Sequence, residues 1–190
     1  MRIISGKYKG RSFDIPRNFK ARPTTDFAKE NLFNILLNYT DFEETKALDL
    51  FSGTGSISLE LLSRGCEHVT SVEIDTQHFA HLKKCVSALG DDNWHVIRDD
   101  VFRFLRRCSA SYDLIFADPP YALKKLAEIP DIVMNSTLLN EDGIFIFEHG
   151  IFIFEHGKDN DFSKHPCFFR HIAYGSVNFS FFRHPQKEEE

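Results

Sequence analysis

The chain has 190 residues, 42% hydrophobic and 27% charged, a balance typical of one soluble domain with a sizeable core. No stretch approaches the ~18 apolar residues needed to span a membrane, and no apolar leader follows Met1. The four cysteines are far apart and have no histidines at ligand spacing, so neither a zinc site nor a disulfide framework is predicted. We therefore expect a cytoplasmic protein that uses no metal and contacts no membrane.

Positive charge is concentrated at the start of the chain. Residues 1–22 contain seven basic residues and one acid, a net charge of +6, whereas the other 168 residues sum to −11. A basic segment on an acidic body is expected of a protein that grips phosphates with one end, and a solvated terminus is the alternative. Residues 2–17, with two glycines and a proline, predict a small β-hairpin arm outside the main fold.

The next segment is predicted to be helical. Thr24-Thr25-Asp26 supplies an N-cap and an acidic first turn, and apolar residues follow at helical spacing as far as Tyr39, which predicts a helix over 26–39.

From residue 46 onward, short apolar runs alternate with amphipathic segments. The apolar runs predict strands at 47–51, 69–74, 94–97, 114–117 and 144–147. The segments between them predict helices at 56–64, 76–89 and 101–107, and a helical stretch that Pro130 interrupts or restarts. A closing hairpin is predicted at 168–174 and 177–183.

The central runs are almost continuously apolar, which is typical of parallel strands buried on both faces. We therefore predict an α/β fold, a doubly wound and mostly parallel seven-stranded sheet. We assign residues 23–184 to this domain, 1–22 to the arm and 185–190 to a disordered tail.

One segment is duplicated: residues 143–149 recur without change at 150–156. The unit is too short to be a structural repeat, so we interpret it as a local duplication. Only one copy can occupy the fifth central strand. The first copy follows 138–142, a loop of ordinary length, and we expect it to take that place while the second is displaced or poorly ordered.

A glycine loop follows the first predicted strand, in Asp49-Leu-Phe-Ser-Gly53-Thr-Gly55. The glycines let the backbone pass close to a ligand, and the next helix points free N–H groups at it. Glu73, at the end of the second strand, is placed to hold ribose hydroxyls. A dinucleotide site would have a third glycine where Ser58 stands. The loop suits S-adenosylmethionine better, since this cofactor has no pyrophosphate and the loop carbonyls or Asp49 can accept its ammonium.

A second motif, Asp118-Pro119-Pro120-Tyr121, ends the fourth predicted strand. Ligands bind at this edge of an open α/β sheet. The prolines remove backbone donors, leaving a carboxylate, a proline carbonyl and an aromatic ring to face a ligand. Two acceptors that bind the hydrogens of an exocyclic base amine free its lone pair for attack on a methyl group, while the ring can stack on the base.

These motifs, in this order, make the chain similar to the amino-methyltransferase superfamily. Three further stretches resemble the RsmD-type family within it, namely residues 2–11, 22–26 and 118–121. That family methylates N2 of a guanine in bacterial small-subunit (16S) ribosomal RNA. The resemblance covers residue 2 to about 148 and resumes at 174–183; the duplicated strand departs from it, since the family has one copy there.

The resemblance implies S-adenosylmethionine as the cofactor. Its methionine end would be lined by the glycine loop, through Asp49, Phe51, Gly53 and Gly55. Glu73 would hold the ribose and Ile74 would pack on the adenine. The adenine edge would bond to Asp100 and to the backbone of Val101.

The resemblance also implies how RNA is held. The catalytic residues would be Asp118, Pro119, Pro120 and Tyr121, which would hold the target base toward the cofactor. The RNA backbone would be bound by Lys7, Lys9 and Arg11. The active site would be closed over by a segment of four residues, Arg22, Pro23, Thr24 and Thr25. The implied partner is ribosomal RNA within a small-subunit assembly particle, and we expect a monomer.

Three alternatives stay open. An adenine-N6 DNA methyltransferase shares Asp-Pro-Pro-Tyr, although the chain leaves little room for a DNA-reading domain. A glutamine side-chain methyltransferase also uses a Pro-Pro-Tyr loop, and the basic arm weighs against it. A non-catalytic RNA-binding module that kept the methyltransferase shell is the third alternative, against which the intact glycine loop and Asp118 speak.

Overall fold

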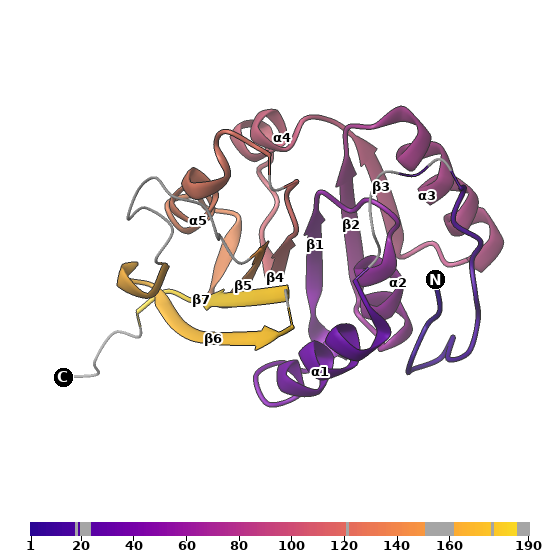
Figure 1. Cartoon of the computed structure of the whole chain (residues 1–190), viewed down its shortest axis with the longest axis horizontal. Coiled ribbons are helices and arrows are strands. Elements are labelled where there is room, and N and C mark those ends of the chain that lie inside the picture. The colour runs from indigo at the N-terminus through magenta and orange to yellow at the C-terminus, as the bar shows by residue number, and fades with distance from the viewer. Residues whose placement is uncertain (18, 20–23, 121, 151–161, 176, 186–190) are drawn as a thin grey trace.

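The computed structural model describes residues 1–17, 19, 24–120, 122–150, 162–175 and 177–185. Within these residues, seven strands form one sheet in the order β3-β2-β1-β4-β5-β7-β6 (Figure 1). The strands are β1 (Lys46–Leu50), β2 (His68–Glu73), β3 (Trp94–Arg98), β4 (Tyr112–Ala117), β5 (Leu139–Gly150), β6 (Phe168–Tyr174) and β7 (Val177–Phe182). The strands from β3 to β5 run parallel, and β7 is antiparallel to both β5 and β6. The predicted doubly wound, mostly parallel sheet is confirmed.

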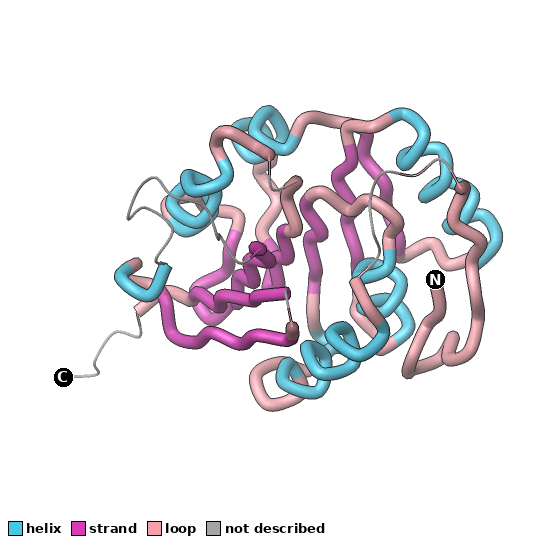
Figure 2. Tube along the Cα trace, viewed as in Figure 1, coloured by secondary structure: helices cyan, strands magenta, loops and turns pink. Residues whose placement is uncertain are grey.

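Helices lie on both sides of the strands (Figure 2). They are α1 (Asp26–Leu36), α2 (Ser56–Ser63), α3 (Thr76–Leu89), α4 (Val101–Arg107) and α5 (Ile129–Met134), with short 3-10 turns at Phe42–Glu44, Leu126–Glu128 and Phe162–Lys164. Apolar residues of α1, α2 and α3 pack in one core with one face of the sheet, and those of α4 and α5 pack in a second core with the other face. Burial of both faces is the reason why residues 114–117 of β4 and 144–147 of β5 are apolar throughout. β2 departs from this pattern, since its Thr70, Ser71 and Glu73 are buried polar residues.

Two predicted boundaries are wrong. The first helix ends at Leu36, because the chain turns at residues 37–39 instead of continuing to Tyr39. The segment 138–142 is not a plain loop, since Leu139 already pairs with Tyr112 and the register then shifts before Ile144 pairs with Leu114. Because of that irregularity, β5 begins at Leu139, well before its apolar run at 144–147, and the run alone does not predict this start. Pro130 restarts the helical stretch, standing at the beginning of α5.

The N-terminal segment is part of the main fold, which corrects the prediction of an arm outside it. Its two limbs meet at one antiparallel bridge between Arg2 and Ser12. The side chain of Ile3 is 2% exposed and belongs to the core beside α1 and α2. At Gly6, with φ +82°, a Cβ would lie 1.8 Å from the carbonyl oxygen of Ser63, so only glycine permits this approach.

Buried charge joins the N-terminal segment to α1 and α2. The carboxylate of Glu60 accepts hydrogen bonds from the backbone N–H groups of Ile4 (2.9 Å) and Ser5 (3.1 Å). The ammonium of Lys29, 1% exposed, donates to the carbonyl of Arg2 at 2.7 Å and to Ser56 Oγ at 3.1 Å. Glu60 also pairs with Arg64 Nε at 3.0 Å. Sequence patterns missed Lys29 and Glu60, because several of their partners are distant in the chain.

From its bridge the N-terminal chain runs along α3 (Figure 1). The guanidinium of Arg11 donates to the carbonyl of Ala88 near the end of α3, at 2.7 Å. Further on, the ring of Phe19 lies 4.4 Å from that of His78, near the start of α3. Because α3 runs opposite to the strands, the chain travels from the amino edge of the sheet to the carboxyl edge.

The first copy of the duplicated segment lies in the sheet, as predicted. Within β5, Ile144 to Phe147 pair with β4 on one side, and Phe145 to Gly150 pair with β7 on the other. Residues 151–156 of the second copy lie outside the described residues, as do 186–190 of the expected tail, so both expectations stay predictions.

Candidate active site

The glycine loop leaves β1 at the carboxyl edge of the sheet with an unusual backbone. Phe51 has φ 61°, the one non-glycine residue with positive φ in the described chain, and Gly53 and Gly55 follow at 53° and 78°. A Cβ on Gly55 would lie 2.5 Å from Cδ2 of Leu82. Left-handed backbone at a bulky residue costs energy and is typical of functional loops. Gly55, the N-cap residue of α2, has no side chain to cap the helix, whereas the backbone N–H of Ser58 in the first turn binds the Asp49 carboxyl. The other N–H groups at the start of α2 can be offered to a ligand.

Asp49 is buried at the end of β1 and held by a chain of hydroxyls. Ser58 donates a hydrogen bond to its carboxyl, Ser58 and Ser71 are joined at 2.6 Å, and Trp94 Nε1 donates to Ser71 Oγ at 2.8 Å. Burial raises the pKa of Asp49 to about 7, against the opposing effect of the Ser58 hydrogen bond. Ser58, which stands where a dinucleotide site would have its third glycine, thus holds the Asp49 carboxyl in place. The sequence did not reveal this role.

Glu73 joins two loops at this edge. Its carboxylate accepts from the backbone N–H of Gly53 and from that of Asp75, both at 2.8 Å. Carboxylate oxygens have lone pairs beyond these two bonds, so ribose hydroxyls can still be bound. Ile74 beside it is 58% exposed, an apolar side chain that a flat ring can cover. The residues therefore fit a nucleoside cofactor.

Asp100 and Val101 lie after β3 at the same edge. The Asp100 carboxylate caps α4 by accepting from the N–H of Arg103 at 2.9 Å. The side chain of Val101 is buried. The carboxyl ends of β3 and β2 are adjacent, since the N–H of Asp99 donates a hydrogen bond of 3.3 Å to the carbonyl of Glu73. The two predicted adenine contacts are therefore close to Glu73, and their roles stay predictions.

Asp118 follows β4, next to β1. Its N–H points to the carbonyl of Leu50 at 3.4 Å, which places the start of the Asp-Pro-Pro motif beside the glycine loop. Burial raises the pKa of Asp118 to about 7. Pro119 is buried and Pro120 is exposed, whereas Tyr121 lies outside the described residues. The structure thus brings Asp49, Glu73 and Asp118 to one edge.

Glu148, on β5, is an acidic residue of this edge that sequence reasoning missed. It is 4% exposed, and its pKa is raised to about 9 by burial and by the charges of Asp118 and Asp49. Like Asp118, it is an acid that ends an apolar run, and this signal could have identified it.

The predicted RNA contacts are divided between the two edges. Lys7 forms an ion pair with Asp91 at 2.8 Å, and Lys9 and Arg11 are exposed near the end of α3 at the amino edge. Thr25 caps α1, accepting from Ala28 N at 3.2 Å, and Thr24 precedes it. Arg22 and Pro23 lie outside the described residues, so the predicted closure over the site stays a prediction.

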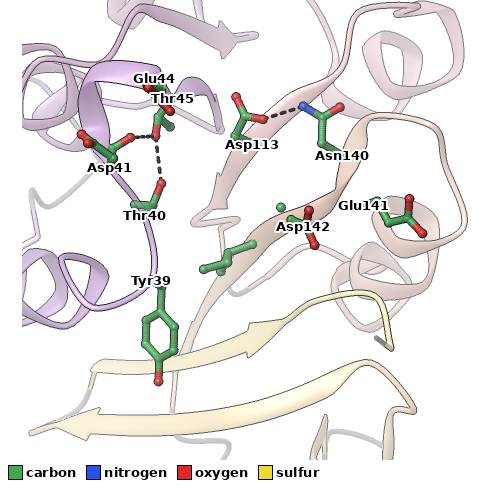
Figure 3. Close-up of a pocket in the computed structure, with 11 residues that line it drawn as sticks. Tyr39, Thr40, Asp41, Glu44, Thr45, Asp113, Asn140, Glu141 and Asp142 are labelled. Carbon is green, nitrogen blue, oxygen red and sulfur yellow. Dashed lines mark hydrogen bonds between the residues drawn. The ribbon is translucent and has the colours of Figure 1, made fainter. Parts of the chain in front are cut away.

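A separate cavity of about 320 Å³ lies at the amino edge, remote from these groups (Figure 3). Its polar residues bond to one another: Asn140 donates to Asp113 at 2.6 Å, and Thr45 Oγ1 donates to the carbonyl of Asp41 at 2.5 Å. It contains none of the predicted site residues.

Two negative findings concern the described part of the chain. It contains no group of three or more His, Cys, Asp and Glu side chains that could hold a metal ion. None of its helices is both long and apolar enough to cross a membrane.

Comparison with known proteins agrees with this geometry. The family model described as Conserved hypothetical protein 95 matches residues 1–183. Over 147 residues the chain is 37% identical to ribosomal RNA small subunit methyltransferase D of Buchnera aphidicola subsp. Baizongia pistaciae, covering 77% of this chain and 74% of that protein.

Solved structures are similar as well. The proposed methyltransferase yhhF of Escherichia coli superposes with a TM-score of 0.81 at 26% identity, over 98% of this chain and 99% of that one. SMU.776, a proposed methyltransferase complexed with SAH, matches 63% of this chain and 34% of its own, at 25% identity and a TM-score of 0.54. SAH is what S-adenosylmethionine becomes when its methyl group has left. The chain therefore belongs to the family of Conserved hypothetical protein 95, the RsmD-type family, and is an S-adenosylmethionine-dependent methyltransferase.

Proposed function

We propose that the chain transfers a methyl group to the exocyclic N2 of a guanine in small-subunit ribosomal RNA. The observation that carries the proposal is the position of Asp118, whose carboxyl ends β4 directly beside the glycine loop. An acceptor there can hold an amine against the cofactor. The relative named ribosomal RNA small subunit methyltransferase D supports RNA of the small subunit as the substrate.

On this proposal the cofactor is held by the two loops that Glu73 joins. Asp49 and backbone N–H groups at the start of α2 bind its charged methionine end, Glu73 binds the ribose, and Ile74 covers the adenine. When bound, S-adenosylmethionine supplies an electrophilic methyl group on a sulfonium, which becomes a neutral thioether once the methyl has left.

The chain's own contribution at the acceptor is orientation. A carboxylate at Asp118 accepts one amine hydrogen, the proline carbonyl accepts the other, and the amine lone pair is then directed at the methyl group. Asp118 is half-buried, and its reduced contact with water strengthens these hydrogen bonds. The proton that the amine loses on methylation can pass to Asp118 or to water.

RNA binding is proposed to involve the N-terminal segment and the start of α1. Lys9 and Arg11 are exposed, and Arg11 keeps its charge and further N–H donors for phosphate although one of them binds the Ala88 carbonyl. Lys7, in contrast, already pairs with Asp91. Thr24 and Thr25, together with Arg22 and Pro23, are proposed to cover the bound base. The enzyme is proposed to act as a monomer on an assembly particle in the cytoplasm.

The test is to incubate the protein with methyl-labelled cofactor and unmethylated small subunits, then digest the RNA and identify the labelled nucleoside. We expect N2-methylguanosine at one position. Label in N6-methyladenosine, or in protein glutamine, would overturn the proposal. A protein that binds the cofactor in calorimetry but transfers no label would be a binding module instead.

A further inference from the structure

The starting observation is an unpaired buried oxygen. Among the residues that the structure describes, Oε2 of Glu148 is one of two buried side-chain polar atoms without a hydrogen-bond partner, the other being Nδ2 of Asn178. A buried polar group without a partner is energetically costly, so such groups are rare unless a ligand completes them. Glu148 is 4% exposed and stands at the edge that holds the proposed site.

The strand register places Glu148 beside Asp118. Phe116 pairs with Ile146 and Ala117 with Phe147, so the next positions along the two parallel strands are Asp118 and Glu148. Side chains at equivalent positions of neighbouring strands point to the same face, and the strands lie about 4.8 Å apart. The charge of Asp118 acts on Glu148, as expected for this proximity. Two carboxyls at this spacing can contact adjacent atoms of one base.

The edge of a guanine matches this pair. Its N2 amine is flanked by ring N1, which carries a hydrogen and therefore needs an acceptor. We infer that Glu148 is a specificity-determining residue, whose Oε2 accepts the N1–H of the target guanine while Asp118 accepts from its N2 amine. This inference rests on the proposed function, since it presupposes a guanine in the site.

The protonation state of the pair supports the inference. Because its pKa is raised to about 9, Glu148 is neutral at pH 7 and does not repel a neighbouring carboxylate. The charge of Asp118 favours a Glu148 proton directed toward it, which leaves the other oxygen as the acceptor. Glutamine reproduces this arrangement, with its amide N–H₂ toward Asp118 and its oxygen toward the base, whereas leucine reproduces only the shape.

The experiment uses small subunits reconstituted with either guanine or 2-aminopurine at the mapped position. 2-Aminopurine keeps the 2-amino group, but its ring N1 has no hydrogen. The ratio of kcat/KM for the two substrates is measured for the wild type, Glu148→Leu and Glu148→Gln. Asn178→Leu is the matched control, because Asn178 is equally buried on the neighbouring strand β7 but pairs with His149, on the opposite face.

We expect wild type, Glu148→Gln and Asn178→Leu to prefer guanine by about 10- to 100-fold, and Glu148→Leu to lose most of that preference while binding the cofactor as before. The analogue also lacks the guanine O6, an acceptor that cannot bond to Oε2 of Glu148 acting as an acceptor, so this loss is expected to affect all variants alike. Equal ratios in the wild type and Glu148→Leu, with N2-methylguanosine still the product, would overturn this inference alone. A product other than N2-methylguanosine would overturn the proposed function and the inference with it.

Discussion

At the residue scale, different residues are proposed to bind the amine and the cofactor: Asp118 binds the amine, and Glu73 binds the cofactor. We predict that Asp118→Ala lowers kcat by about 10²- to 10³-fold, since one positioned hydrogen-bond acceptor is removed, while the cofactor Kd stays nearly unchanged. Glu73→Ala should do the reverse and raise the cofactor Kd first. Label transfer and calorimetry on both variants check this. Near-normal turnover of Asp118→Ala would remove Asp118 from the mechanism.

The pH dependence of the reaction follows from the raised pKa of Asp118. Burial raises it to about 7, so below that pH the carboxyl is protonated and becomes a poorer acceptor of the amine hydrogens. We predict that kcat/KM falls by about tenfold per pH unit below 7. Asp118→Asn cannot titrate and should lose this acid limb at a reduced plateau. A limb that persists unchanged in the variant would instead point to Asp49, whose pKa is also about 7.

At the scale of elements, the N-terminal segment contributes to stability. Ile3 is almost completely buried against α1 and α2, and truncation there leaves a cavity. We predict that Ile3→Ala lowers the free energy of unfolding by about 2–5 kcal/mol. Leu37→Ala, at a side chain that is 59% exposed, is the control and should change it by less than about 0.5 kcal/mol. Equal effects in denaturant unfolding would show that the segment packs only loosely.

The duplication is the second question at this scale. Residues 150–156 are followed by Gly157, so deleting them leaves glycine after His149, in the place of Gly150 in β5. Because the sheet already holds the first copy between β4 and β7, we predict that the deletion keeps or raises solubility and activity. Sedimentation after expression and label transfer measure both. An unfolded deletion protein would show that the second copy is needed in the core.

At the scale of the whole molecule, the charge asymmetry predicts how RNA binding responds to salt. We predict that Lys9→Ala and Arg11→Ala together reduce the slope of log K against log salt by about 0.7–0.9 for each phosphate that is no longer neutralised. Lys7→Ala should have less effect, because Lys7 already pairs with Asp91. Lys46→Ala, exposed at the start of β1, is the control. Filter binding over a salt series measures the slopes, and an unchanged slope would mean that RNA is gripped elsewhere.

The sequence by itself determined the sheet, most of its helices and one edge of the site. Short apolar runs such as 114–117 and 144–147 are typical of buried parallel strands, and both the glycine loop and Asp-Pro-Pro are contiguous in the chain. Such signals are local, so they can be found without knowing the fold. The boundaries that failed, at Leu36 and Leu139, depend on where the chain turns or shifts register.

Only the tertiary structure decided which distant residues meet. Ser58 holding Asp49, Glu60 binding the N–H groups of Ile4 and Ser5, and Glu148 beside Asp118 are contacts between separate elements. The composition of the N-terminal segment predicts a polar arm, yet Ile3 packs into the core and Gly6 lies against the backbone of Ser63. Pairings of this kind depend on strand order and helix packing, which no single stretch of sequence encodes.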